Sequence, residues 1–234
     1  MEIRKYYIII FIYSFLLSNQ VSDYEVTLYG MPMANVKMSF NDTIYKDLEI
    51  ITLYFETSTN DIVSQFFRVN NKYETIIKKN DLDIMSFQKL TYQPNVINKI
   101  NTFEHNGNVI YEGTNIFIPK NHFNIFSLLY YLSITPFNNI NSEVNLEREG
   151  LIYKCSINKK INKNLYEFEL KFDLLKDDNL ISVVEDSDIF TWGLFREGAY
   201  NKVFVDPELN QIQKCVFSVG FSNLEAEIKK PLNK

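Results

Sequence analysis

Histidine, cysteine, glycine and alanine are all scarce in this chain of 234 residues. Neither of its two histidines, His105 and His122, stands in a metal-ligand spacing or beside an acidic pair. The two cysteines do not form a C-x-x-C redox motif, and the seven glycines form no phosphate-binding loop, G-x-G-x-x-G or G-x-S-x-G. We therefore expect no enzyme, no catalytic residue, no metal and no cofactor.

Basic residues are outnumbered by acidic ones, 24 against 29, and the sequence pI is about 5.2. Such a chain has no general positive field for a phosphate backbone, so we expect no nucleic-acid partner. Hydrophobic residues make up 46% and charged residues 23%, a balance that excludes intrinsic disorder. Fifteen tyrosines and nineteen phenylalanines beside only three alanines favour pleated sheet over helix.

The first residues have the pattern of a secretory signal peptide. Arg4 and Lys5 precede an uncharged apolar run over residues 6–17, and small residues suited to cleavage follow at Ser18 and Ser22. The run is too short to cross a bilayer comfortably, since a spanning helix needs about 20 apolar residues. We expect a signal peptide over residues 1–22 and a single β-rich domain over residues 23–234. The alternatives are an uncleaved anchor, which is the one case in which we expect membrane association, and a buried strand.

Beyond residue 23 the hydrophobic pattern repeats every second residue. In residues 33–40, Ala34, Val36, Met38 and Phe40 share one face, which is typical of a half-buried strand. Similar runs separated by short turns predict further strands at residues 24–29, 48–56, 65–69, 73–78, 84–92, 109–112, 151–157, 165–174, 180–184, 202–205, 212–219 and 224–228. This even spacing favours an antiparallel meander.

Residues 121–133 break this rhythm and predict a helix. Asn121 is suited to cap its start, Pro136 follows its end, and its side chains are apolar nearly all round. A helix of this kind must be buried on most sides, and a curved sheet can enclose it. The expected fold is therefore mainly β: a single domain in which a curved antiparallel sheet or half-barrel meander packs around one apolar α-helix.

Four segments resemble bacterial domain-of-unknown-function family 3108. FFRVNNKYETIIKKNDLDIMSFQKL, residues 66–90, resembles its central motif, and NIFSLLYYLS, residues 124–133, resembles its D-x-x-S-x-x-Y-x-L-R helix. DIFTWGLFREG and IQKCVFSVGFSNLEAEI are similar to its Trp-bearing strand and its closing strand. The likeness extends from residue 24 to residue 228, and the order and spacing of the segments agree.

The chain departs from that family's pattern at several positions. Asn124 replaces a usual acid, Ser133 replaces a usual arginine, and Met33-Ala34 stands where the first hairpin tends to have glycine. A function that needs the arginine is therefore in doubt here. The resemblance implies an exported, β-rich protein of the bacterial cell envelope with no established activity. We accordingly expect the chain in the periplasm or at the periphery of the outer membrane.

Cys155 and Cys215 each lie on the apolar face of a predicted strand. Cys155 shares its face with Tyr153 and Ile157, and Cys215 shares its face with Phe217. In an oxidising compartment the pair could form a structural disulfide if the two strands are close in space. The alternative is two free, buried cysteines that pack as small hydrophobic residues.

Two acidic groups allow more than one interpretation. Glu185-Asp186-Ser187-Asp188 could offer carboxylate oxygens to Ca²⁺, but no loop of known coordination spacing follows, and we favour a solvated turn. Residues 143–149 are most simply the polar face of an edge strand.

The aromatic residues suggest a binding function. Tyr73, Phe126, Tyr130 and Trp192 lie on predicted faces that could line the concave side of the sheet and bind an apolar or lipid-like ligand. By analogy of fold alone, a half-barrel around a helix is similar to periplasmic lipoprotein carriers. The alternative is that these side chains are packed core.

Three hypotheses for the function follow. The first is a non-enzymatic envelope protein that binds an apolar ligand or the extended segment of another envelope protein. The second is a structural or protein-interaction module of the envelope, with an exposed sheet edge or apolar patch. An enzyme such as a hydrolase ranks third, because no catalytic motif supports it.

Overall fold

The chain folds into one sheet of fifteen strands that curls into a nearly closed barrel. The computed structural model describes residues 19–175, 181–220 and 222–229. The strands are β1 (Asn19–Leu28), β2 (Met31–Tyr45), β3 (Leu48–Thr59), β4 (Asn70–Lys78), β5 (Ile84–Gln93), β6 (Val96–His105), β7 (Asn108–Tyr111), β8 (Phe117–Ile118), β9 (His122–Phe123), β10 (Glu143–Arg148), β11 (Leu151–Asn162), β12 (Leu165–Leu174), β13 (Tyr200–Asp206), β14 (Gln211–Val219) and β15 (Ser222–Ile228). The helices are α1 (Ile125–Ile134) and α2 (Ile189–Phe195), with 3-10 turns η1 (Val63–Gln65) and η2 (Phe137–Asn139).

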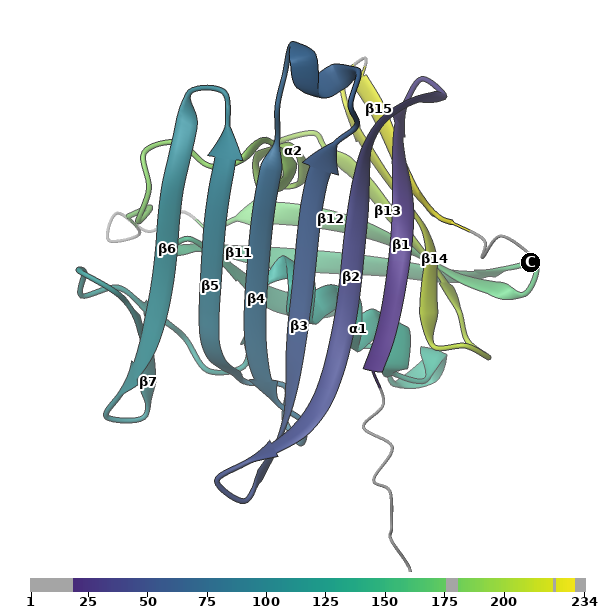
Figure 1. The fold of residues 1–234 in the computed structure, drawn as a ribbon. Helices are drawn as coiled ribbons and strands as arrows, with labels where there is room; N and C mark the ends of the chain where they lie inside the picture. The colour runs from purple at the N-terminus through teal and green to yellow at the C-terminus, as the bar shows by residue number, and fades with distance from the viewer. Residues whose placement is uncertain (1–18, 176–180, 221, 230–234) are drawn as a thin grey trace, which may run out of the picture.

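The strand order follows the chain with one exception. The order is β8-β7-β6-β5-β4-β3-β2-β1-β15-β14-β13-β12-β11-β10-β9, so β1 and β15 join the two halves of the chain. All neighbours are antiparallel except β9 and β10, which are parallel. In Figure 1, β1 to β6 form the front wall, β11 to β13 cross behind it, and α1 lies between the walls. The prediction of a mainly β, antiparallel meander around an apolar helix is confirmed.

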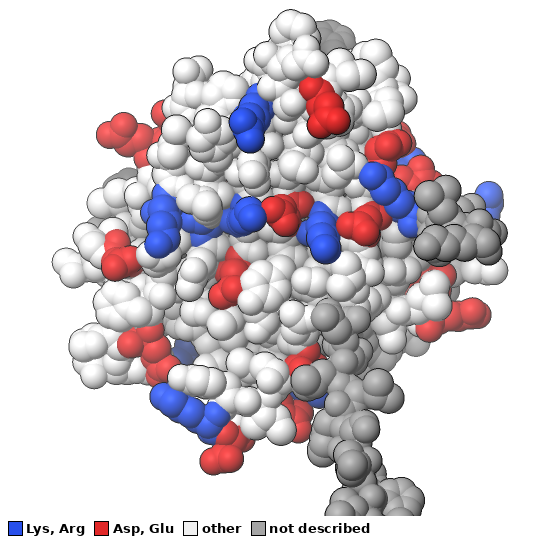
Figure 2. Space-filling view, viewed as in Figure 1, with Lys and Arg blue, Asp and Glu red and all other residues white. Residues whose placement is uncertain are grey.

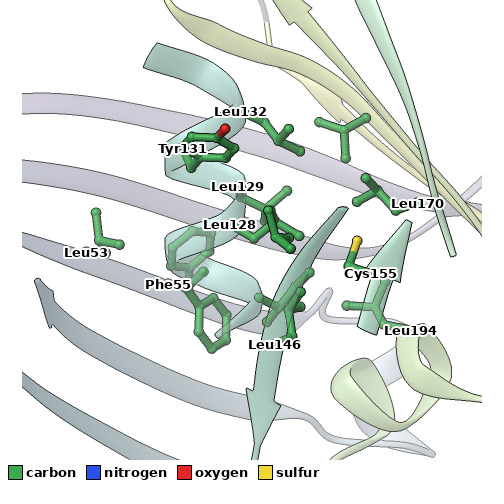
Figure 3. Packing of buried hydrophobic residues seen from close by; sticks show 14 of the residues in the cluster. Leu53, Phe55, Leu128, Leu129, Tyr131, Leu132, Leu146, Cys155, Leu170 and Leu194 are labelled. Carbon is green, nitrogen blue, oxygen red and sulfur yellow. The ribbon is translucent and has the colours of Figure 1, made fainter. Parts of the chain in front are cut away.

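Helix α1 fills the hollow of the curved sheet. Eight of its ten residues are buried, and Leu128 and Leu132 are completely inaccessible to solvent. Figure 3 shows Leu128, Leu129 and Leu132 among side chains from both walls, including Leu53, Leu146 and Leu170. Because the helix is apolar nearly all round, it can pack against the front and back walls at once.

The start of α1 differs from the prediction. Asn124, and not Asn121, is the N-cap, since its side chain accepts a hydrogen bond from the Ser127 backbone N–H. The Ser127 hydroxyl in turn accepts a hydrogen bond from the Asn124 backbone N–H, which completes a capping box. His122 and Phe123, predicted as helix, instead form β9 beside β10.

Three predicted strands are wrong. Residues 65–69 lie in the loop between β3 and β4, where Asn60 accepts a hydrogen bond from the Val63 N–H and supports a 3-10 turn. Residues 181–184 are not in a strand, and residue 180 lies outside the described residues. The predicted Trp-bearing strand is α2, because Asp188 caps a helix at this point. Strand β6 was not predicted, since polar residues interrupt its alternation.

Both cysteines are free and buried. Cys155 lies on β11 and Cys215 on β14, and β12 and β13 separate these strands in the sheet. Burial raises the pKa of each thiol to about 12. In the structure the two residues therefore pack as small hydrophobic side chains, and no disulfide joins them.

The predicted end of the signal peptide at residue 22 falls inside β1. Gln20, Val21 and Ser22 pair with Phe40, Ser39 and Met38 of β2. The buried Ser22 hydroxyl also accepts a hydrogen bond of 2.9 Å from the Gln211 amide. Residues 1–18 lie outside the described residues, and none of the helices in the described part is long and apolar enough to cross a membrane.

In cells that export the chain, we expect a mature protein that begins at Asn19 and not at Asp23. Cleavage after Ser22 would remove four residues of β1 together with their ladder to β2. We expect this loss to lower the free energy of unfolding by about 2 kcal/mol. Intact-mass measurement of the exported protein checks the first residue. A mature chain that starts at Asp23 and melts at the same temperature as one that starts at Asn19 would contradict the expectation.

Candidate functional site

A loop closes the barrel along one side, between the β5–β6 strands and the β10–β11 hairpin, and we call this line of contact the seam. Residues 181–188 lie along this seam, and they hydrogen-bond to both sides of it. Val183 N–H donates to the Glu149 carbonyl at 2.8 Å, while the Asn98 side chain of β6 donates to the Asp186 carbonyl at 3.1 Å. The segment therefore connects the β5–β6 side of the sheet to the β10–β11 hairpin.

A tight turn places Glu149 at the seam. Glu149 and Gly150 connect the paired residues Arg148 and Leu151, and both have a positive φ, of 54° and 91°. Two successive positive φ angles are the signature of a type I′ hairpin turn. A side chain at position 150 would also collide with the Ile181 carbonyl oxygen, so glycine is required there.

Three buried charged side chains meet beneath this turn, and we call Lys89, Glu149 and Asp188 the buried ion network. The Lys89 ammonium on β5 contacts the Glu149 carboxylate, and it lies 2.6 Å from Oδ2 of Asp188. All three residues are at most 2% exposed. Buried charges require partners of opposite sign, and here one cation contacts two carboxylates from two other segments of the chain.

Asp188 has the most partners in the network. Its carboxylate accepts hydrogen bonds from the Tyr73 hydroxyl at 2.8 Å, from the Thr191 hydroxyl at 2.6 Å and from the backbone N–H groups of Phe190 and Thr191 in α2. Burial by itself would raise the pKa of Asp188, but the Lys89 ammonium and the hydrogen bonds from Thr191 outweigh it and lower the pKa. Burial and the nearby Asp188 carboxylate raise the pKa of Tyr73, which stays a hydrogen-bond donor.

Glu147 is a second buried acid at the seam. Its Oε1 accepts hydrogen bonds of 2.6 Å from both the Tyr111 hydroxyl and the Gly150 backbone N–H. Burial raises the pKa of Glu147 from 4.5 to about 7, although both hydrogen bonds act in the opposite direction. This carboxyl group therefore changes its charge near neutral pH, in contact with a turn that also positions Glu149.

The geometry indicates that the network closes the barrel. Its charged groups are paired with one another and are shielded from solvent. In the described part of the chain, no three histidine, cysteine or acidic side chains are placed to hold a metal ion together. The contacts of Lys89 with both carboxylates thus support cohesion between β5, the β10–β11 turn and α2.

Two predictions about acidic residues are wrong at this seam. Residues 185–188 are not a solvated turn throughout, because Asp188 is fully buried as the N-cap of α2. Residues 143–149 do form strand β10 and its turn, but Glu147 and Glu149 point inward and are 1% and 2% exposed. The partners of these acids, Lys89, Tyr73 and Tyr111, come from distant strands. The local sequence pattern therefore could not predict that these residues meet.

Sequence reasoning also missed Lys89. Strand β5 turns its polar residues Lys89, Thr91 and Gln93 inward and leaves Leu90 and Tyr92 almost half exposed. The available signal was the two-residue spacing between Phe87 and Lys89, which places the lysine on the face of a core residue.

Two cavities lie on either side of α2. The first, of about 560 Å³, opens at the seam, and we call it the seam cavity. Its lining includes Phe67, Val96, Arg148 and Trp192. The second, of about 960 Å³, lies between β12 and the segment that joins α2 to β13, and we call it the wall cavity.

The wall cavity arises from a break in the sheet. Strand β12 pairs with β13 only as far as Leu170, which faces Asn201, whereas its pairing with β11 continues to Leu174. The floor of the cavity is apolar and includes Tyr153, Phe172 and Phe195, each at most 9% exposed. The rings of Phe172 and Phe195 are stacked with their centroids 4.6 Å apart.

Arg148 lies beneath α2 and links the two cavities. Its guanidinium is 5.5 Å from the ring centroid of Tyr153 and 5.2 Å from that of Phe195, which are cation–π contacts. It donates a long hydrogen bond of 3.5 Å to the Thr191 carbonyl, and its Nε has no hydrogen-bond partner among the described residues.

The structure does not bring the four predicted binding residues together in one cavity. Tyr73 and Phe126 are both 2% exposed and pack in the core with their ring centroids 4.6 Å apart. Tyr130 is half-buried and packs edge-on against Phe40, whereas Trp192 is 47% exposed and lines the seam cavity. A binding role for these four remains a prediction, and Tyr73 has the separate role of hydrogen-bonding Asp188.

Comparison with known proteins supports the fold and no more. A scan against protein-family models finds no match, and a search of curated proteins finds none either. Among solved structures, the chain is similar to a beta-barrel-like protein of the domain of unknown function DUF1849 from Brucella abortus. The two share 8% sequence identity with a TM-score of 0.52, over 92% of this chain and 97% of the other. At this identity the likeness shows a shared barrel-like fold.

Replacing Lys89 with Met should strongly destabilise the barrel. The variant leaves Glu149 and Asp188 buried without their cation, and we expect the free energy of unfolding to fall by about 3–5 kcal/mol. Urea denaturation of Lys89→Met beside Lys99→Met, an exposed lysine on the neighbouring strand, measures the difference. Adding Glu149→Gln and Asp188→Asn to the Lys89→Met chain should recover part of the loss. Equal stability of the two single variants would show that the network does not close the barrel.

Replacing Glu147 with Gln should change how stability depends on pH. The native state binds the Glu147 proton more tightly than the unfolded chain does. The contribution of this residue to the free energy of unfolding is therefore complete below pH 4.5 and is lost as the pH rises through about 7. This rise in the pKa of Glu147 corresponds to about 3 kcal/mol in the free energy of unfolding. We therefore expect Glu147→Gln to match the unmodified protein at pH 5 and to be more stable by about 2–3 kcal/mol at pH 8.

Denaturant unfolding at both pH values checks this expectation. The control is Glu143→Gln, which changes an exposed glutamate of the same strand. A stability difference that is the same at pH 5 and at pH 8 would contradict it.

Proposed function

We propose that this protein is an exported, non-enzymatic, ligand-binding protein of the bacterial cell envelope, and that it takes an apolar or lipid-like ligand into the wall cavity. The observation that carries the proposal is the break between β12 and β13 above a floor of buried aromatic side chains. The N-terminal sequence pattern and the family resemblance support export and an envelope location.

The wall cavity has the size and lining of a binding site for an apolar molecule. Ligand pockets are commonly about 300–1,000 Å³, mostly apolar, with a few polar groups that orient the ligand. Here the apolar floor of Tyr153, Phe172 and Phe195 is surrounded by charged residues at the rim, among them Lys171 and Arg196. A ligand could place its chain on the floor and its polar end at this rim.

The filled interior of the barrel also favours the wall cavity as the ligand site. The hollow that a barrel could offer to a ligand is occupied by α1, whose side chains contact both walls. A ligand site in this fold therefore depends on an opening in the wall, and the ladder between β12 and β13 ends at Leu170.

The same break favours a second candidate, which is a protein-interaction module. Residues 171–174 of β12 pair with β11 on one side, and their register with β13 has ended. An extended segment of a partner could add to this free edge through backbone hydrogen bonds. The two candidates differ in the occupant of the cavity, so binding of a lipid-like probe distinguishes them.

We expect the protein to bind cis-parinaric acid, a fluorescent fatty acid, in a saturable manner. Substitution of Ala199, a half-buried residue that lines the cavity, by Phe should fill the opening and weaken binding by at least about tenfold. The matched control is Ala34→Phe, which changes another half-buried alanine on β2, away from the cavity. Fluorescence titration measures the affinity, and thermal unfolding confirms that both variants are folded.

Absence of saturable binding by the unmodified chain would overturn the ligand proposal and favour the interaction module. Equal affinity of all three proteins would show that the probe binds at another place.

A further inference from the structure

The meander places three loops together at one end of the barrel. Because successive strands are antiparallel, the β1–β2, β3–β4 and β5–β6 connections lie at the same end, and the β2–β3, β4–β5 and β6–β7 connections lie at the opposite end. Figure 1 shows the first set at the top of the molecule, where the loop with η1 stands above the strands. We call residues 29–32, 60–69 and 93–97 the apolar end.

The two ends differ sharply in charge. The apolar end contains only Asp61 and Arg68 as charged residues. The opposite loops, residues 45–48, 79–83 and 105–108, contain the charged residues Lys46, Asp47, Lys79, Asp81 and Asp83. In Figure 2 charged side chains are sparse at the upper end of the molecule and frequent across its middle and lower parts.

The apolar end also presents the most exposed large hydrophobic side chains of the described residues. Phe66 is 85% exposed, Ile97 is 74% exposed and Ile62 is 73% exposed. Met31, on the neighbouring hairpin, is 59% exposed. Single exposed apolar residues are ordinary, but their concentration on adjacent loops with few charges marks an interaction surface.

Hydrogen bonds fix the loop that carries Ile62 and Phe66. The Asn60 side chain accepts from the Val63 N–H at 2.9 Å and donates to the Pro32 carbonyl at 2.7 Å, which connects this loop to the β1–β2 hairpin. At the base of the loop, Thr59 N–H donates to the Val69 carbonyl at 3.1 Å. The two apolar side chains are therefore held outward by a bonded framework and do not fold back onto the protein.

We propose that the apolar end inserts Ile62, Phe66 and Ile97 into a lipid surface. Ile62 and Phe66 project from one loop and Ile97 from another, and the lack of charge gives no complement to an acidic or basic partner. Arg68 lies 5.9 Å from the ring centroid of Tyr92, which pairs with Ile97 across the hairpin. Aromatic rings and long cationic side chains beside aliphatic residues are typical of the headgroup level of membranes.

This attachment differs from the anchor considered for residues 6–17, because it uses loops of the folded barrel. It also does not rest on the ligand proposal, since the protein can bind a lipid surface with no ligand in the wall cavity. The seam cavity reaches this end, because Phe67 and Val96 line it. Docking would thus bring the opening between the β5–β6 hairpin and α2 close to the lipid.

The test is flotation of the full chain with phosphatidylcholine vesicles. We expect the unmodified protein to float with the vesicles, and we expect Ile62→Ser with Phe66→Ser to lower the bound fraction by at least about tenfold. The control is Ile44→Ser with Leu48→Ser, which removes exposed hydrophobic residues, 65% and 46% exposed, at the opposite end and should bind as the unmodified protein does.

Three results would overturn the proposal: no flotation of the unmodified chain, equal flotation of all three proteins, or flotation that appears only when phosphatidylserine replaces part of the phosphatidylcholine. Because parinaric acid binding is measured without vesicles, the ligand proposal can fail while vesicle binding is retained, and the reverse also holds.

Discussion

Closure of the barrel depends on the contact of one buried ammonium with two buried carboxylates. Lys89 reaches from β5 in the front wall to Glu149 in the β10–β11 turn and to Asp188 at the start of α2. Moving these charges out of water costs several kcal/mol per ion, which only close pairing and additional hydrogen bonds can offset. The seam is therefore specific, since removal of Lys89 leaves two carboxylates buried without the cation that they share.

This constraint positions the features around α2. Asp188 both pairs with Lys89 and caps the helix, so the helix begins where the seam is closed. From this fixed start, Trp192 faces the seam cavity and Phe195 reaches the floor of the wall cavity. Arg148, one residue before Glu149, stacks on Phe195 beneath the helix. The same short helix thus separates two openings in a barrel whose centre is filled by α1.

Much of the sheet could be predicted from alternation, and the failures have physical reasons. Residues 33–40 and 73–78 alternate cleanly and form parts of β2 and β4, because one face of each strand packs against the core. Residues 65–69 also look like a strand, but the hydrogen bonds of Asn60 favour a 3-10 turn with Phe66 exposed. Residues 189–195 are apolar and aromatic enough for a strand, yet the Asp188 cap and its tertiary partner Lys89 stabilise a helix.

The sequence by itself determined the fold class, the central apolar helix and the antiparallel order of neighbouring strands, because these follow from hydrophobic periodicity and turn residues that act over a few positions. The tertiary structure alone decided which acids are buried, where the sheet is broken and which end of the barrel is apolar. Lys89 is separated from Glu149 by 60 residues along the chain and from Asp188 by still more, and the three charges become partners only after the sheet curls. The free energy of a buried charge depends on what surrounds it in three dimensions, and no local pattern contains that information.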